Sequence, residues 1–219
     1  MPDFDQDLLS MQEARTLASQ AFEAWKVWAK ASQQDVDRVC AAMAAAAFNA
    51  ADRLGQLAHE ETGYGVPAHK RLKNEFASRN VWESIKDIKT AGVIHHDPEK
   101  RIYQIAWPMG VVAGLTPSTN PTSTVIYKIL IAVKARDAIV IAPHPAAARC
   151  SYEAAALMAK AAEENGAPAG LISCMRQVSL AAEPMAHGHA GAGVDFGAAG
   201  GPAGTRRREA GGTESGRFL

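Results

Sequence analysis

The chain has 219 residues, of which 47% are apolar, and its 23 basic residues balance its 23 acidic residues. This composition is ordinary for a globular protein with a sizeable core, and the lack of net positive charge argues against nucleic acid or an anionic membrane as a partner. No apolar run approaches the roughly 20 residues that a bilayer requires, and three widely spaced cysteines without a C-x-x-C pair indicate a reducing compartment, so we expect a cytoplasmic protein.

The first 90 residues predict three helices. Apolar residues recur at helical spacing over residues 17–28 and again over residues 36–57. The stretch ETGYGVPAHK, which is rich in glycine and proline, then interrupts the pattern. A third apolar period follows over residues 72–88. We therefore expect a helical layer over residues 10–90.

The period of the sequence changes after residue 91. Short β-branched or aromatic runs, separated by turn signals, predict a β excursion over residues 92–106. From residue 110 onward, predicted strands and helices alternate, which is typical of right-handed βαβ units in a parallel sheet. We expect β-α-β-α-β over residues 110–175, and hence an α/β fold with N-terminal helices.

Residues 181–219 differ in character from everything before them. They are crowded with Gly, Ala and Arg, and they show no apolar period that could build a core. We expect a disordered tail, and a truncated domain over residues 1–180, because a sheet of two or three strands keeps an open edge. The stretch GAGVDFG in the tail has no strand before it, so we do not interpret it as a dinucleotide-binding loop.

The segment TPSTNPTST, residues 116–124, joins a predicted buried strand to a predicted helix. Loops in this position of a parallel sheet meet at its carboxyl edge, where ligands bind. Pro117 and Pro121 restrict the loop backbone. Asn120 offers an uncharged amide N–H at the helix entrance, and such a donor can stabilise a developing oxyanion. Asparagine is also a common N-cap, so its position alone leaves both roles open.

The stretch GVVAGLTPSTNPTSTVIYKILIAVKARDAIVIAPHP, with ETGYGV before it and GAPAGLISC after it, resembles the cofactor-domain half of a CoA-acylating aldehyde dehydrogenase. The nearest subgroups are the acylating acetaldehyde and sulfoacetaldehyde dehydrogenases. The resemblance implies a partial, Rossmann-type cofactor-binding domain over residues 1–180. It does not extend to residues 181–219, so we expect this tail to be non-homologous to the family. It also implies the reaction of an aldehyde, CoA and NAD(P)+ to acyl-CoA and NAD(P)H, with NAD or NADP as cofactor and coenzyme A as co-substrate. A complete domain of this family implies a homo-oligomer.

The resemblance also assigns roles to individual residues. Asn120 would be the side-chain amide of the oxyanion hole. The loop would line the nicotinamide-ribose side of the cofactor, and Lys128 would support the loop. His144 would lie near the adenosine ribose, in place of the lysine of ordinary aldehyde dehydrogenases. The implied cofactor-binding residues are Thr116, Pro117, Ser118, Thr119, Lys128, Pro143 and His144. No metal site is implied.

The catalytic cysteine and the pyrophosphate loop of the family lie later in the chain than LISC, so we expect this chain to be inactive. Cys150 is the alternative nucleophile, but its predicted place at the start of a sheet-covering helix favours a packing role. A competing interpretation is a non-catalytic remnant that binds nucleotide weakly or associates with a full-length relative through its sheet edge. For His95 and His96, next to Asp97, we expect a solvated turn rather than a metal site.

Overall fold

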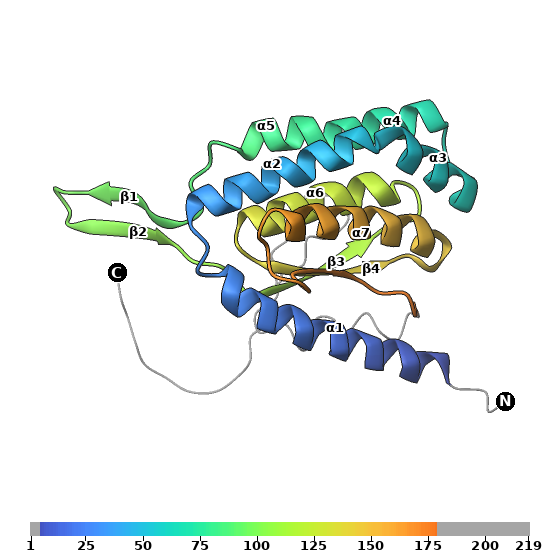
Figure 1. Cartoon of the computed structure of the whole chain (residues 1–219), viewed down its shortest axis with the longest axis horizontal. Coiled ribbons are helices and arrows are strands. Elements are labelled where there is room, and N and C mark those ends of the chain that lie inside the picture. The colour runs from blue at the N-terminus through green and yellow to red at the C-terminus, as the bar shows by residue number, and fades with distance from the viewer. Residues whose placement is uncertain (1–4, 179–219) are drawn as a thin grey trace.

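The computed structural model describes residues 5–178, and the expectations for residues 181–219, the disordered tail and the GAGVDFG stretch, lie outside this range. The helices pack in layers on a small parallel sheet (Figure 1). One helix, α1, covers one face, α6 and α7 cover the other, and the remaining helices lie over α6 and α7. The helices are α1 (Gln6–Trp28), α2 (Gln33–Asn49), α3 (Ala51–Thr62), α4 (Pro67–Glu75), α5 (Val81–Ile85), α6 (Pro121–Lys134) and α7 (Ala148–Glu164).

The sheet contains β3 (Val111–Thr116), β4 (Ala138–Pro143) and β5 (Ile172–Cys174), parallel and in this order. The crossovers run through α6 and α7, so the predicted α/β fold is confirmed. Every residue of the central strand β4 is buried, since helices cover both faces. Within residues 5–178, no helix combines the length and the apolar character needed to cross a bilayer.

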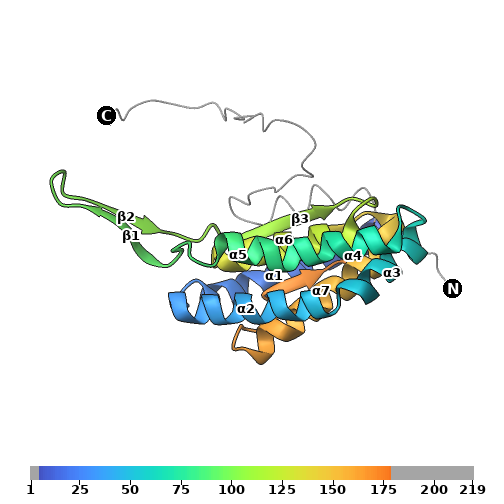
Figure 2. The ribbon, with the colours of Figure 1, turned by 90° about the horizontal axis from the view of Figure 1, so that it is seen from above.

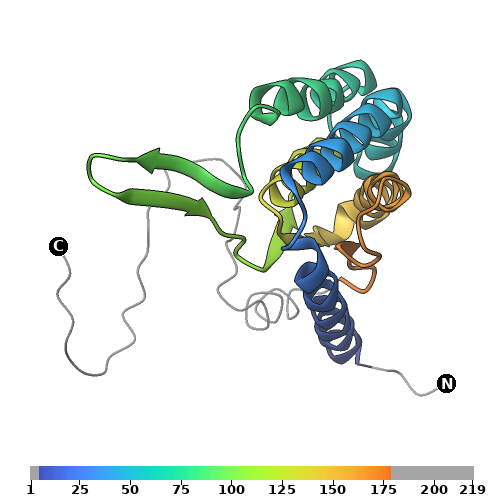
Figure 3. The ribbon, with the colours of Figure 1, turned by 60° about the vertical axis from the view of Figure 1, so that its left-hand side comes forward.

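A β-hairpin projects from the helical body (Figures 1 and 3). Its strands, β1 (Gly92–Asp97) and β2 (Ile102–Ala106), pair antiparallel and are exposed along most of their length. The two histidines lie in strand β1 and not in a turn, which corrects our expectation, and the ring of His96 stacks on Tyr103 at 4.1 Å. The hairpin leads into the amino end of β3, so it lies at the opposite end of the sheet from the carboxyl edge (Figure 2).

The structure corrects the predicted single helix over residues 36–57. The chain breaks at Ala50, with φ −95° and ψ 4°, and α3 turns to pack along α4. The two helices meet closely, because a Cβ on Gly55 would lie 2.9 Å from the backbone nitrogen of Arg71. Asn74 of α4 also donates to the carbonyl of Ala51 at 3.0 Å. Tertiary contacts therefore impose a bend that the apolar period does not reveal.

The third predicted helix contains a π-helical segment, η1 (Phe76–Asn80), between α4 and α5. A π-helical segment has a wider turn, so it shifts the faces of the two flanking helices relative to one another. Leu72 and Phe76, which we expected on a buried apolar face, are 59% and 63% exposed. The apolar side chains of Leu72 in α4 and Phe76 in η1 therefore lie at the surface and not in the core.

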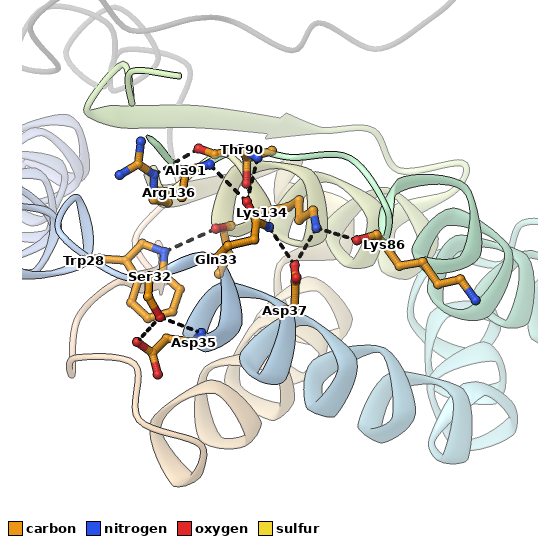
Figure 4. A network of polar contacts seen from close by, with 11 residues as sticks. Trp28, Ser32, Gln33, Asp35, Asp37, Lys86, Thr90, Ala91, Lys134 and Arg136 are labelled. Atoms are coloured by element: carbon orange, nitrogen blue, oxygen red, sulfur yellow. Dashed lines mark hydrogen bonds and ion pairs between the residues drawn. The ribbon is translucent and has the colours of Figure 1, made fainter. Parts of the chain in front are cut away.

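A polar network anchors the far end of α6 (Figure 4). The buried amine of Lys134 donates to the carboxylate of Asp37 at 2.5 Å and to the carbonyl of Lys86 at 2.8 Å. The guanidinium of Arg136 donates to three backbone carbonyls, which belong to Ala29, Thr90 and Ala106. Partners are required here because an unpaired buried charge is costly. The network connects the carboxyl end of α6 to α2 and to the base of the hairpin. It therefore fixes the position of α6, whose amino end follows the loop at 116–120.

Candidate active site

The loop at 117–120 lies at the carboxyl edge of the sheet, beside the end of β4. The backbone nitrogen of His144 donates to the carbonyl of Thr116 at 3.0 Å, and Thr116 pairs with Pro143 in the register of the two strands. The structure therefore brings together three of the predicted cofactor-binding residues. The remaining loop residues, Pro117 and Ser118 half-buried and Thr119 exposed, lead directly to Asn120 at the start of α6.

Asn120 occupies the N-cap position of α6, but its side chain makes no cap hydrogen bond. Only the backbone carbonyl of Asn120 takes part in the helix, accepting from the nitrogen of Thr124 at 3.2 Å. The side-chain oxygen Oδ1 instead accepts a hydrogen bond from Nζ of Lys73 at 2.7 Å. Of the two roles that the sequence leaves open for this side chain, the structure therefore excludes capping.

The side chain of Asn120 lines a groove of about 760 Å³ between the loop and the α4–η1–α5 helices. The walls of the groove are mostly apolar, and a few polar groups interrupt them, as is common in small-molecule sites. The lining residues that matter for the chemistry below are Leu72, Lys73, Phe76, Pro117, Asn120 and Tyr127. The exposed apolar face of α4 thus forms one wall, and the loop and α6 form the other.

Helix α4 also holds the loop through side chains one turn apart. Nζ of Lys70 donates to the carbonyl of Thr119 at 3.1 Å, and burial lowers the pKa of this amine. The hydroxyl of Thr122 donates to Oδ1 of the buried Asn74 at 2.9 Å. Positions 70, 73 and 74 share one face of α4. Their side chains bond to Thr119 and Asn120 at the end of the loop and to Thr122 in the first turn of α6.

Two other predicted residues lie beneath or beside the groove. Lys128 is fully buried, and its amine donates to the carbonyl of Leu115 at 2.6 Å, so it supports the end of β3. His144 is exposed, and its Nδ1 accepts from the nitrogen of Ala146 at 3.1 Å, which caps the short 3-10 turn η2 (Pro145–Ala147). The hydroxyl of Thr116 is buried and has no hydrogen-bond partner among the residues that the structure describes.

All three cysteines of the sequence lie within the described residues, and all are buried. The thiol of Cys150 donates to the carbonyl of Ala147 at 3.5 Å, and burial raises its pKa to about 12. Burial likewise raises the pKa of Cys40 to about 12 and that of Cys174 above its usual range. Since the thiolate is the nucleophilic form, the structure favours packing roles for these residues.

Sequence reasoning missed Lys73 and misplaced Leu72 and Phe76. The apolar spacing of the latter two was read as core, because periodicity does not distinguish a buried face from a groove wall. Lys73 lies 47 residues before Asn120 in the chain, and no local signal pairs them. Within residues 5–178, no three His, Cys, Asp or Glu side chains gather as a metal ion would require.

Comparison with known proteins matches the aldehyde dehydrogenase family over residues 6–196. An acetylating aldehyde dehydrogenase from Geobacillus thermoglucosidasius is 52% identical with a TM-score of 0.82, over 84% of this chain and 40% of that one. The bifunctional aldehyde-alcohol dehydrogenase AdhE of Escherichia coli K12 is 38% identical over 171 residues, 78% of this chain and 19% of its own length. A sulfoacetaldehyde dehydrogenase from Acholeplasma sp is 35% identical over 151 residues, 68% of this chain and 31% of that protein.

The chain therefore spans less than half the length of these relatives, and the matched range runs past residue 180, where we placed the start of the tail. The relatives are the kinds of enzyme that the TPSTNPTST loop suggested, and the solved fold of the Geobacillus enzyme agrees with the fold described above. The match covers most of the sequence, and the residues from α1 to β5 lie within it. The chain belongs to the aldehyde dehydrogenase family.

Proposed function

We propose that this chain contributes the oxyanion-binding and ribose-facing part of a CoA-acylating aldehyde dehydrogenase, which converts an aldehyde, CoA and NAD(P)+ to acyl-CoA and NAD(P)H. One observation carries the proposal: the amide of Asn120 lines an apolar groove and does not cap its helix. The names of the Geobacillus, E. coli and Acholeplasma relatives support this reaction class. Acetaldehyde and sulfoacetaldehyde remain the proposed substrates.

The role of Asn120 is to stabilise charge on the aldehyde oxygen. When a thiolate attacks the carbonyl carbon, that oxygen becomes negative, and an N–H donor fixed beside it lowers the barrier. Lys73 holds Oδ1, so Nδ2 is the part of the amide that remains to donate. The apolar walls from Leu72 and Phe76 lower the local dielectric constant, which strengthens such a contact.

The strand ends fit the ribose end of a dinucleotide better than its phosphates. The buried hydroxyl of Thr116, which has no hydrogen-bond partner within residues 5–178, offers a polar group beside Pro143 and His144. Neither crossover, residues 116–121 or 143–148, contains a glycine, so neither forms the glycine-rich turn that cradles a pyrophosphate. NAD(P) would supply the hydride acceptor, and the residues at this edge would orient its ribose.

A reactive thiol is the part of the chemistry that residues 5–178 do not supply. All three cysteines are buried, and burial raises the pKa of Cys150 and that of Cys40 to about 12. We therefore propose that the 219-residue chain alone does not reduce NAD(P)+ in the presence of aldehyde and CoA. We also propose a cytoplasmic location, which the three free thiols support.

A chimera provides the test. Residues 5–178 replace the matched segment of the Geobacillus acetylating enzyme, and formation of acetyl-CoA and NADH is followed by absorbance. The chimera should turn over, and Asn120→Ala should lower kcat by about 10²-fold with little change in the KM for cofactor, because an oxyanion donor acts mainly in the transition state. The matched control is Asn49→Ala, an exposed asparagine at the end of α2. A folded chimera without turnover, or one that Asn120→Ala leaves fully active, would contradict the proposal.

A second proposed function is association through the hairpin. Both strands expose apolar side chains, and Trp107, just after β2, is 81% exposed. A two-stranded hairpin is at best marginally stable on its own, so a partner that covers it would stabilise it. We propose a second copy of this chain or a full-length relative as that partner. Ile105→Lys should shift sedimentation velocity profiles toward the monomer, whereas Val27→Lys, an equally exposed site on α1, should not. A profile that neither substitution changes would contradict the proposal.

A further inference from the structure

We propose that Lys73 is a positioning residue that sets which end of the Asn120 side-chain amide faces the groove. The inference deepens the proposed function, since it concerns the donor on which that function rests. An amide has an oxygen that accepts and a nitrogen that donates, and only the nitrogen can stabilise an oxyanion. A rotation of 180° about the last side-chain bond would therefore replace a stabilising donor with a repelling acceptor.

The chemistry of lysine fixes the orientation. A lysine ammonium has three donors and no acceptor, so it can bond only to Oδ1 of Asn120. The Nζ to Oδ1 distance of 2.7 Å is typical of a charge-assisted hydrogen bond. With Oδ1 held on the side of α4, both hydrogens on Nδ2 are left for other acceptors. Lys73 and Asn120 both line the groove, so the freed donor lies where an aldehyde would bind.

The surroundings keep Lys73 available for this contact. The nearby carboxylate on the same helix, Glu75, is engaged by Nε of Arg71 at 2.7 Å. The neighbouring lysine, Lys70, is bonded to the carbonyl of Thr119 and holds the loop one residue before Asn120. The positive charge of Lys73 also polarises the amide, because electron density withdrawn toward Oδ1 makes the Nδ2 hydrogens better donors.

The first test uses the 219-residue chain and requires no activity. In a sample labelled with 15N-asparagine, the side-chain signals of Asn120 are assigned by their loss in Asn120→Ala. Lys73→Met should speed the exchange between the two Nδ2 protons, because a hydrogen bond to the oxygen strengthens the double-bond character of the C–N bond. Lys160→Met, at an exposed lysine of α7, should leave these signals unchanged. Unchanged Asn120 signals in Lys73→Met would overturn the proposal.

The second test separates positioning from substrate binding in the chimera. Lys73→Met should lower kcat by on the order of 10-fold, less than the loss of the donor itself, with the KM for aldehyde unchanged. Lys73→Arg, which retains a charged donor, should restore most of the rate. In the Asn120→Ala background, Lys73→Met should have no further effect, because it acts through Asn120. An additive loss, or a loss confined to KM, would instead make Lys73 a substrate contact.

The two tests also distinguish this inference from the proposed function. If Asn120→Ala leaves the chimera fully active, the oxyanion role fails, while the NMR experiment still decides whether Lys73 orients the amide. If the chimera responds to Asn120→Ala but not to Lys73→Met, the proposed function stands and the positioning role fails.

Discussion

The two crossovers at the carboxyl edge of the sheet are built differently, although they lie side by side. At the second, between β4 and α7, His144 caps η2, and the carboxylate of Glu61 accepts from the backbone nitrogens of Arg149 and Cys150 at 2.8 and 2.6 Å. At the first, between β3 and α6, the N-cap residue Asn120 makes no side-chain cap hydrogen bond. The helix after the second crossover therefore has two of its first backbone N–H groups satisfied by Glu61 of α3, whereas the side chain of Asn120 satisfies none at the start of α6.

The two loops at this edge of the sheet therefore differ in the role of their polar side chains: those at the second stabilise the fold, and the amide at the first is available for chemistry. A side chain that accepts a hydrogen bond from a backbone N–H stabilises the fold, so its removal mainly lowers the free energy of unfolding. The side chain of Asn120 accepts no hydrogen bond from a backbone N–H of its helix, and its Oδ1 is instead bonded to Lys73 of α4. Cys150, the candidate nucleophile next to the second crossover, is buried in the first turn of α7. The comparison predicts opposite outcomes for substitutions at the two loops.

The largest expected effect concerns the three buried thiols, of which that of Cys150 lies in the first turn of α7. With the pKa of Cys150 raised from 9.0 to about 12, its thiolate fraction near pH 8 should be about 10³-fold below that of a free cysteine, apart from steric protection. We expect iodoacetamide to label none of the three cysteines rapidly in the native chain, and all three in guanidinium. Mass spectrometry against time gives the result, and rapid native labelling of Cys150 would break the comparison.

The same shift has a consequence for stability at high pH. A thiol whose pKa is raised by folding keeps its proton in the native state where the unfolded chain has lost it. The contribution to stability is full below pH 9 and is lost as the pH rises toward 12. Urea unfolding between pH 8 and pH 10.5 should show this decline, and Cys150→Ser should make it shallower. A free energy of unfolding that does not fall over this range would contradict the assignment.

The next effect concerns Asn74, which joins α4 to the first crossover. Its amide donates to Ala51 and accepts from Thr122, and all three groups are buried from water. Asn74→Ala leaves a buried carbonyl and a buried hydroxyl without these partners, so we expect a loss of about 2–3 kcal/mol in the free energy of unfolding. Urea denaturation measures it. Thr122→Ser retains the hydroxyl and is the control, which should lose markedly less.

The smallest effects compare the two helix starts directly. Glu61→Ala removes the acceptor at the start of α7 and should cost about 1–2 kcal/mol, because the carboxylate both caps the helix and interacts with its dipole. Asn120→Ala removes no cap and should cost less than about 0.5 kcal/mol. Thermal unfolding of both variants tests the contrast. Equal losses would mean that Asn120 is structural after all.

The sequence predicted the alternation of strands and helices after residue 110, because this follows from local periodicity. The strand AIVIAP and the helix from residue 121 lie where the apolar pattern and the prolines placed them. The bend at Ala50 was not predictable, because it depends on Asn74 and Gly55 meeting across two helices. No glycine or proline stands at the bend, and its N-cap residue, Ala50, has no side chain that could cap α3.

Of the candidate site, the loop residues could be predicted from the sequence, but the residues of the facing helix could not. Asn120 stands out in its loop, where prolines and hydroxyl residues surround it. The wall that faces it comes from α4, and the pairing of Lys73 with Asn120 depends on how two distant segments pack. The sequence also could not show whether Asn120 caps α6. Its backbone stands at the N-cap position, but its side chain makes no cap hydrogen bond. Sequence identifies the position, and only the structure identifies its use.

The lack of a side chain at Gly55 sets the distance between α3 and α4, and therefore the position of the groove wall that α4 provides. Any larger residue there would place an atom 2.9 Å from the backbone of Arg71 and push α4 outward by several tenths of an ångström. Lys73 lies half a turn further along the same helix, at the end of a 2.7 Å bond that tolerates little stretching. A substitution on α3, remote from the groove, would therefore loosen the amide that faces it. The orientation of the Asn120 amide can therefore be altered by a substitution that lies outside the groove.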